Sequence, residues 1–308
     1  MTDLILHHFD SSPFSEKVRL ILGFKQLAWR SVRVPLILPK PDVVALTGGY
    51  RRTPFLQIGA DIYCDTALAA RVIDGIAPSP PLYPEAAGGL QHLLAQWADS
   101  TLFWTAIPYA SQPAGLAVMF AGVPPEFIKA LMADRAAMTA GMRRQTVADA
   151  AAALGTYFAW LESMLGTGQP FLLGDAPCIA DFAVAHALWY VHRAPPVLGV
   201  LAPFARLTAW YGRVVAFGHG TREELSSEDA IGIAARAAGH VPAQVEPGLG
   251  FEAGAQVTVS AIDYAADLVP GTLVGLTARE VVIERRDERA GTLHVHFPRI
   301  GYQIKQPS

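Results

Sequence analysis

Hydroxyl side chains gather where a first helix is expected to begin. Residues 10–19 read Asp-Ser-Ser-Pro-Phe-Ser-Glu-Lys-Val-Arg and follow a short apolar run. Ser12 before Pro13 suits the cap and the first position of a helix, so Ser12 could simply be a helix start. A hydroxyl and free N–H groups at a helix N-terminus also favour an anion. A thiol bound beside Ser12 would therefore shift toward its thiolate form.

Two further polar pairs stand where a strand and a second helix are expected to begin. Thr53-Pro54 opens an apolar run, and Asp65-Thr66 opens the next helical pattern. A proline at the head of a strand is typical of a sheet edge or of a cis bond, and we predict that the Thr53–Pro54 bond is cis. Asp65 and Thr66 can cap their helix. Each pair alone is ordinary turn chemistry.

In their order and spacing, the three segments resemble the glutathione transferase family. The run that starts at Ser12 is similar to the active-site segment of its serine-type members, such as the omega, tau, theta and zeta classes. The resemblance implies that Ser12 is the catalytic residue, that glutathione is the co-substrate and that no other cofactor is needed. It also implies a glutathione-binding role for a set of six residues: Phe14, Arg52, Thr53, Pro54, Asp65 and Thr66.

The resemblance also gives some of these residues a particular part of glutathione. Thr53-Pro54 is similar to the family's Val-cis-Pro, whose first residue pairs through its backbone with the cysteinyl part. Asp65-Thr66 resembles a Glu-Ser pair that holds the γ-glutamyl end. Arg52 falls where many members have a lysine that meets the glycyl carboxylate.

The pattern of apolar residues predicts the elements that position these segments. Residues 1–77 alternate strand and helix and end in a hairpin and a helix, which predicts a thioredoxin-like α/β domain. After a Pro-rich linker, residues 88–217 predict an all-α domain. The two domains together agree with the glutathione transferase fold that the resemblance implies. Residues 218–250 are interpreted as a linker with a short helix. Residues 251–308 hold about five short strands and predict a small all-β, barrel-like module.

A second local match lies in the helical half. Residues 177–182 resemble the family's capping box and hydrophobic staple, with Cys178 in place of the usual Ser or Thr. Asp181 stands at the third helical position, from which its carboxylate can bond back to the cap N–H. Cys178 is therefore interpreted as structural, and so is Cys64, which precedes Asp65 at a strand end.

The electrophile is expected where the helical half faces Ser12. An apolar pocket suits such a substrate, and the candidates on the first helices, which could also be plain core, are Trp97, Phe103, Trp104 and Tyr109. Ser12 would donate a hydrogen bond to the glutathione thiolate, which would attack or isomerise a small apolar electrophile. The competing hypothesis is a non-enzymatic member that carries a ligand or joins an assembly. The electrophile stays open, as does the choice among conjugation, isomerase, lyase and peroxidase chemistry.

Composition restricts the partners and the surroundings. The chain holds 24 Lys and Arg against 27 Asp and Glu, so neither nucleic acid nor an anionic membrane is an expected partner. The N-terminus has no secretory pattern and no apolar run is long enough to span a bilayer, so we expect a cytoplasmic protein. The hydrophobic content of 52% and the pairing usual in the family predict a homodimer.

Two histidines of the C-terminal module could bind a metal. His294 and His296 alternate along one expected strand and share a face. No Cys or His near them in the sequence completes a ligand set. We therefore expect two half-exposed histidines and no metal site.

Overall fold

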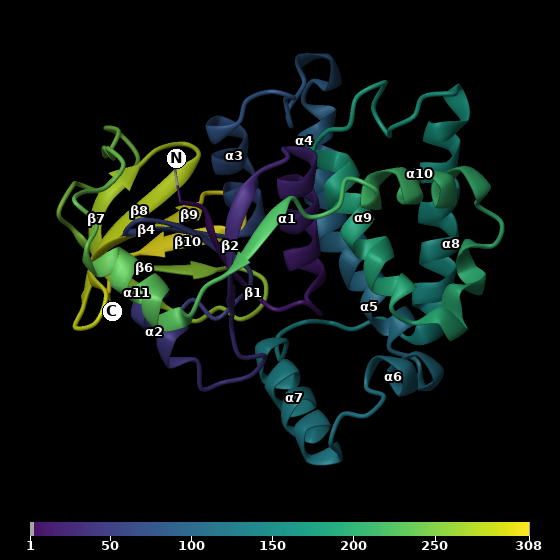
Figure 1. Cartoon of the computed structure of the whole chain (residues 1–308), viewed down its shortest axis with the longest axis horizontal. Helices are drawn as coiled ribbons and strands as arrows, with labels where there is room; N and C mark the ends of the chain where they lie inside the picture. The colour runs from purple at the N-terminus through teal and green to yellow at the C-terminus, as the bar shows by residue number, and fades with distance from the viewer. Residues whose placement is uncertain (1–2, 308) are drawn as a thin grey trace.

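The computed structural model describes residues 3–307. Figure 1 shows a group of β strands on one side, helices α1 (Pro13–Phe24) and α3 (Thr66–Ile76) beside them, and a bundle of further helices beyond. Within the described part of the chain, no helix combines the length and the apolar character needed to cross a bilayer.

The first part of the chain forms the predicted thioredoxin-like α/β domain. Its elements are β1 (Ile5–His8), α1, β2 (Ala28–Arg33), α2 (Pro41–Thr47), β3 (Phe55–Ile58), β4 (Asp61–Cys64) and α3. β1 is parallel to β2 and antiparallel to β3, which is antiparallel to β4. The sequence pattern does not predict α2, because a run of prolines precedes it. Pro41 instead begins the helix, at a position where a missing N–H leaves no bond unmade.

The second part is the predicted all-α domain. Its helices are α4 (Leu90–Trp97), α5 (Phe103–Ala110), α6 (Pro113–Met119), α7 (Pro125–Met138), α8 (Val147–Met164), α9 (Ile179–His192) and α10 (Ala205–Val215), with a π-helical turn at Ala98–Leu102. α9 is almost wholly buried and packs against α1, α4 and α5.

The predicted capping box at the start of α9 is confirmed. Asp181 Oδ2 accepts a hydrogen bond from the Cys178 N–H at 2.9 Å. Its other oxygen accepts from the Leu172 N–H at 3.0 Å and from Trp210 Nε1 at 2.8 Å. These donors satisfy a carboxylate that is fully buried, as a stable interior requires.

The last part of the chain contains the predicted β module. Its elements are β5 (Thr221–Glu224), α11 (Ser227–Ala235), β6 (Gln256–Ala261), β7 (Val269–Leu276), β8 (Glu280–Asp287), β9 (Gly291–Pro298) and β10 (Tyr302–Lys305). β6 to β10 are the five expected strands. Their sheet is continuous with that of the α/β domain, in the order β10-β6-β7-β8-β9-β4-β3-β1-β2-β5.

The junction between the two sheets is the parallel pair of β4 and β9. Asp61 lies opposite His294, and Tyr63 lies opposite His296. At the far edge, β5 pairs with β2 in the same parallel sense. The segment between the helical domain and the module therefore runs back across the α/β domain.

The two faces of the α/β sheet bury different cores. Alternate residues of a strand point to opposite faces, so Tyr63 of β4 lies in the core shared with the helical domain and Ile62 in the core shared with the module. Phe182 of α9 belongs to the first core, and Phe297 of β9 to the second. Burial of each such side chain contributes about 1.5–3 kcal/mol. Both added parts are thus fixed to the α/β domain by apolar packing.

Candidate active site

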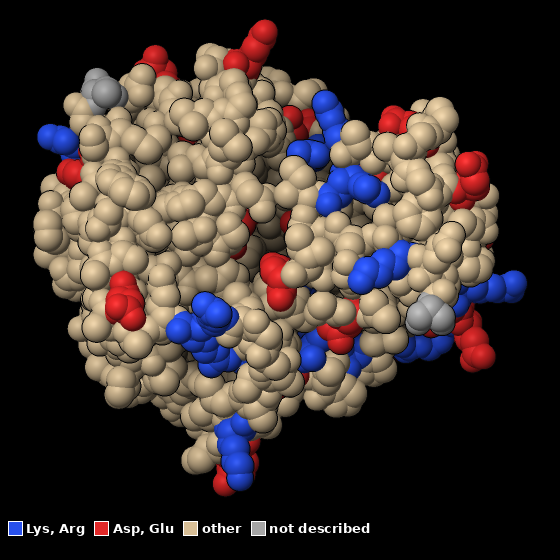
Figure 2. Space-filling model, turned by 180° about the vertical axis from the view of Figure 1, so that it is seen from behind, with Lys and Arg blue, Asp and Glu red and all other residues tan. Residues whose placement is uncertain are grey.

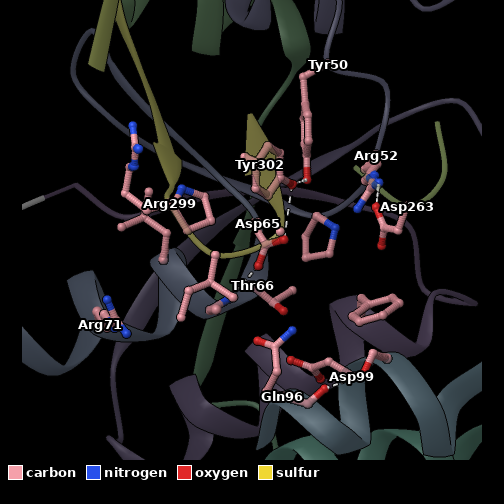
Figure 3. A pocket seen from close by; sticks show the side chains of 18 of the residues that line it. Tyr50, Arg52, Asp65, Thr66, Arg71, Gln96, Asp99, Asp263, Arg299 and Tyr302 are labelled. Carbon is pink, nitrogen blue, oxygen red and sulfur yellow. Dashed lines mark hydrogen bonds and ion pairs between the residues drawn. The ribbon is translucent and has the colours of Figure 1, made fainter. Parts of the chain in front are cut away.

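A cavity lies where the α/β domain, the first helices of the all-α domain and the C-terminal module meet. Figure 2 shows a hollow in this region, between the helical domain and the C-terminal strands, with acidic side chains in its depth. Figure 3 shows Asp65 at the centre of the cavity, with Tyr302 and Tyr50 on one side and Gln96 and Asp99 on the other.

All six residues to which the resemblance gave a glutathione-binding role line this cavity: Phe14, Arg52, Thr53, Pro54, Asp65 and Thr66. The Thr53–Pro54 bond is cis, which confirms that prediction. The Thr53 hydroxyl is buried and has no hydrogen-bond partner among the described residues. Buried polar atoms usually have a hydrogen-bond partner. The unpaired Thr53 hydroxyl is therefore available to a bound molecule.

Asp65 is held in a constrained position at the start of α3. Its φ of 77° lies in the left-handed region, which costs a non-glycine residue about 1–3 kcal/mol and is typical of functional sites. Its carboxylate accepts from the Ala67 N–H at 2.8 Å and from the Tyr302 hydroxyl at 3.1 Å. Burial raises the pKa of Asp65 above its ordinary value, and a cation bound beside the carboxylate would lower this pKa again.

A buried chain of polar groups connects Thr66 to the helical domain. Lys17 Nζ donates to Thr66 Oγ1 at 3.3 Å and to Asp99 Oδ2 at 2.5 Å. His186 Nε2 lies 2.9 Å from the other oxygen of Asp99. Burial alone would raise the pKa of Asp99, but Lys17 and His186 together lower it. Asp99 is therefore an anion on the floor of the cavity.

The sequence analysis did not predict this chain. Lys17 belongs to the run that carries the resemblance, so its position was a usable signal. Asp99 lies in the π-helical turn, and π-helical turns occur frequently at functional sites. No local pattern connects either residue to His186, because the three come from separate helices.

Ser12, the predicted catalytic residue, is not among the described residues that line the cavity. It is the cap of α1, with its Oγ accepting from the Ser15 N–H at 3.1 Å, and only 3% of it is exposed. Among the described residues, no acceptor takes the hydrogen of the Ser12 hydroxyl. Phe14, two positions further along α1, does line the cavity.

Arg52 is held by the C-terminal module. Its guanidinium donates to the Asp263 carboxylate and to the Tyr264 carbonyl oxygen. The Tyr264 ring lies 3.8 Å from the guanidinium carbon, a cation–π contact. Figure 3 shows the Arg52–Asp263 pair at the side of the cavity. Arg52 is thus partly neutralised before any ligand arrives.

The module contributes a whole wall of the cavity, which the sequence analysis did not predict. Besides Asp263 and Tyr264, the wall includes Arg279, Arg299 and Tyr302. Arg299 Nη1 is buried and has no hydrogen-bond partner among the described residues. These residues reach the cavity only because β9 pairs with β4, and no short motif signals that pairing.

The four aromatic residues proposed for the electrophile do not lie on this cavity. Phe103 packs on Phe14 with ring centroids 4.6 Å apart, and Trp104 packs on Tyr264 at 4.8 Å. These two lie directly behind lining residues. Trp97 contacts Tyr157 of α8, and the Tyr109 hydroxyl donates to the Val197 carbonyl oxygen at 2.8 Å.

Comparisons with known proteins identify the family of this fold. Residues 6–81 match the family model for the glutathione S-transferase N-terminal domain, and residues 144–213 match the one for the C-terminal domain. A comparison with curated proteins found no match. The solved structure of a GST-like protein from Pseudomonas syringae is 41% identical, with 100% of both chains covered and a TM-score of 0.83.

Two other solved structures share the fold at lower identity. The glutathione transferase GSTFuA3 from Phanerochaete chrysosporium is 18% identical, with a TM-score of 0.55 over 70% of this chain and 98% of its own. FzlA from C. crescentus is 22% identical, with a TM-score of 0.51 over 69% of this chain and 87% of its own. The full-length match at 41% identity and the two domain models together establish that this chain belongs to the glutathione S-transferase family.

Proposed function

We propose that the protein binds glutathione in this cavity and presents its thiolate at the start of α1 to a small apolar electrophile, which is attacked or isomerised. One observation carries the proposal. The six residues that the sequence resemblance connected to glutathione come from three separate segments, and all of them line a single cavity. Ser12, the residue that would act on the sulfur, caps the helix that begins beside it.

The peptide would be held at both of its charged ends. The γ-glutamyl ammonium group would pair with the Asp65 carboxylate and would offset the rise that burial gives the pKa of Asp65. The glycyl carboxylate would meet cationic side chains of the cavity, of which Arg52 is already engaged with Asp263. The backbone of Thr53 would pair with the cysteinyl part, which places the thiol toward α1.

Ser12 would donate the hydrogen bond that stabilises the thiolate. Its oxygen already accepts from the Ser15 N–H, so its own hydrogen is left to donate to a bound sulfur. The N-terminus of α1 adds a favourable partial positive charge. A free thiol with a pKa near 8.5 is only about 3% ionised at pH 7, and a pKa lowered by about two units makes it mostly thiolate. The gain is roughly twentyfold, partly offset by the lower nucleophilicity of a weaker base.

The electrophile would approach from the helical side of Phe14. Phe14 packs on Phe103 and on the His186 ring, with centroids 4.6 Å and 4.7 Å away. Proximity of the two reactants then supplies most of the remaining acceleration.

The experiment compares Ser12→Ala with Ser11→Ala and Ser15→Ala. We expect Ser12→Ala alone to raise the pKa of bound glutathione, read from thiolate absorbance against pH. It should also lower turnover about ten to a thousandfold, as for one lost hydrogen bond to an anion. Glutathione affinity should change far less, because the peptide is held elsewhere.

Two results would count against this mechanism. An unchanged thiol pKa in Ser12→Ala, together with a shift in one of the other variants, would move the catalytic role to that serine. Glutathione binding without turnover across several classes of electrophile would instead indicate a ligand carrier.

A further inference from the structure

Three side chains from distant parts of the chain meet at the junction of β4 and β9. Asp61 begins β4, His240 lies in the segment after α11, and His294 lies in β9 opposite Asp61. One potential ligand atom of each residue lies within 4.8 Å of the others. The sequence analysis expected no further histidine or cysteine beside His294, but the fold brings His240 against it. This expectation failed because His240 stands in a loop far from the strand.

The distances fit ligands around an ion better than they fit hydrogen bonds. Asp61 Oδ1 lies 3.7 Å from His240 Nδ1 and 3.9 Å from His294 Nδ1. Both separations exceed the roughly 3.2 Å limit of a good hydrogen bond. Donor atoms about 2.0–2.2 Å from a shared tetrahedral ion lie only a little closer together than this.

The two imidazoles are arranged with their Nδ1 atoms unused. His240 and His294 stack with ring centroids 3.7 Å apart and planes 14° apart. Both Nδ1 atoms are buried and have no hydrogen-bond partner among the described residues. Buried ring nitrogens normally find a partner, so two unpaired ones beside the same carboxylate oxygen point to a missing ligand. Because the rings are stacked, their Nδ1 lone pairs lie in nearly parallel planes, and at least one ring has to turn for both to bind one ion.

Outer groups contact two of the three side chains, Asp61 and His294. The Val241 N–H donates to Asp61 Oδ2 at 3.1 Å, and His296 Nε2 lies 3.0 Å from Asp61 Oδ1. The far nitrogen of His294 faces Glu284 Oε2 at 3.7 Å. A carboxylate on the far side of a ligating histidine is common at metal sites, but at 3.7 Å Glu284 lies beyond hydrogen-bond distance of the His294 ring.

We propose that Asp61, His240 and His294 bind a divalent transition-metal ion of the zinc type. Two imidazoles and one carboxylate are donors that Zn²⁺ accepts and that Mg²⁺ and Ca²⁺ do not prefer. Three protein ligands leave the fourth position to water. The ion would join the α/β domain, the connecting segment and the module, and so stabilise their junction. Asp61 begins β4 and Asp65 directly follows its last residue, so the length of the strand separates this site from the cavity.

The test uses the full chain, stripped with a chelator and kept free of glutathione. Titration with ZnCl₂ by calorimetry should show one ion per chain, and Co²⁺ should give the strong visible absorption of a low-coordinate, imidazole-bound ion. His240→Ala should weaken Zn²⁺ binding at least about tenfold and abolish the rise in unfolding temperature that Zn²⁺ gives the wild type. His92→Ala, which removes an exposed histidine of α4, should behave like the wild type.

Several outcomes would overturn the proposal. Equal Zn²⁺ affinity in wild type and His240→Ala would place any bound ion elsewhere, and a Co²⁺ spectrum like that of the ion in water would show that no such site forms. The Co²⁺ spectrum is recorded on the wild type, so it decides the matter even if His240→Ala folds poorly. Mg²⁺ in place of Zn²⁺ should give no heat and no stabilisation.

Discussion

Replacing Tyr302 by phenylalanine removes one hydroxyl and keeps the ring, which tests whether the C-terminal module serves the proposed glutathione site. The hydroxyl lies 3.1 Å from Asp65 Oδ2 and 3.2 Å from the Tyr50 hydroxyl. Burial raises the pKa of Asp65. The carboxylate therefore depends on its hydrogen bonds to stay ionised for the ammonium group of glutathione.

We expect Tyr302→Phe to weaken glutathione binding by about 1–2 kcal/mol, a factor of about 5–30 in Kd. A hydrogen bond to a charged group contributes about 1.5–3 kcal/mol. The loss should fall toward the lower end, because Tyr302 shares one proton between two acceptors and the Ala67 N–H still holds Asp65 at 2.8 Å. Since the lost bond favoured the carboxylate, the pKa of Asp65 rises further, and the deficit grows as the pH falls.

Calorimetric titration with glutathione from about pH 5.5 to about pH 8 measures both the loss of affinity in Tyr302→Phe and the dependence of that loss on pH. Tyr211→Phe is the matched control, because Tyr211 is a buried tyrosine of α10 that is not among the described residues lining the cavity. It should bind like the wild type at every pH. The reasoning is refuted if Tyr302→Phe stays within about twofold of the wild type throughout while Asp65→Ala loses affinity.

Three further predictions follow from the same structure. Asp65→Ala and Thr66→Ala should each weaken glutathione binding by about 1–3 kcal/mol. Unchanged affinity in both variants, measured by calorimetry, would show that the two residues serve only to cap the helix. Burial lowers the pKa of His7 to about 4. As the pH falls, the His7 ring is therefore protonated in the unfolded chain before it is protonated in the folded one, and the free energy of unfolding decreases between about pH 6.5 and about pH 4. The decrease that His7 causes is about 3 kcal/mol. Urea unfolding at these two pH values should show that His7→Gln lacks this decrease. An equal decrease in the wild type and in His7→Gln would contradict the prediction. Light scattering at micromolar concentration should give the mass of two chains, and the mass of one would rule out the homodimer.

The parts of the fold that follow from local patterns were predictable from the sequence. Ser12-Pro13 does cap and begin a helix, the Thr53–Pro54 bond is cis, and the carboxylate of Asp181 closes a capping box. These features depend on residues a few positions apart, for which side-chain chemistry alone sets the local structure.

What the sequence did not predict depends on contacts between distant segments. Tyr302 reaches Asp65, and Asp263 reaches Arg52, only through the pairing of β9 with β4. The apolar alternation of β9 fits either a separate module or an extension of the first sheet. His240 stands in a segment without periodicity, so nothing in its neighbourhood shows that it meets His294.

The parallel pairing of β4 with β9 also sets the order in which the molecule can be completed. During synthesis, residues 61–64 leave the ribosome long before residues 291–298, so β4 stands as an unpaired edge while the helical domain is made. An edge of this kind is a template for another chain, and pairing across so much sequence is slow. The growing chain is therefore most exposed to aggregation during this interval. The interval ends when β9 pairs with β4, the same pairing that brings residues of the module to the cavity.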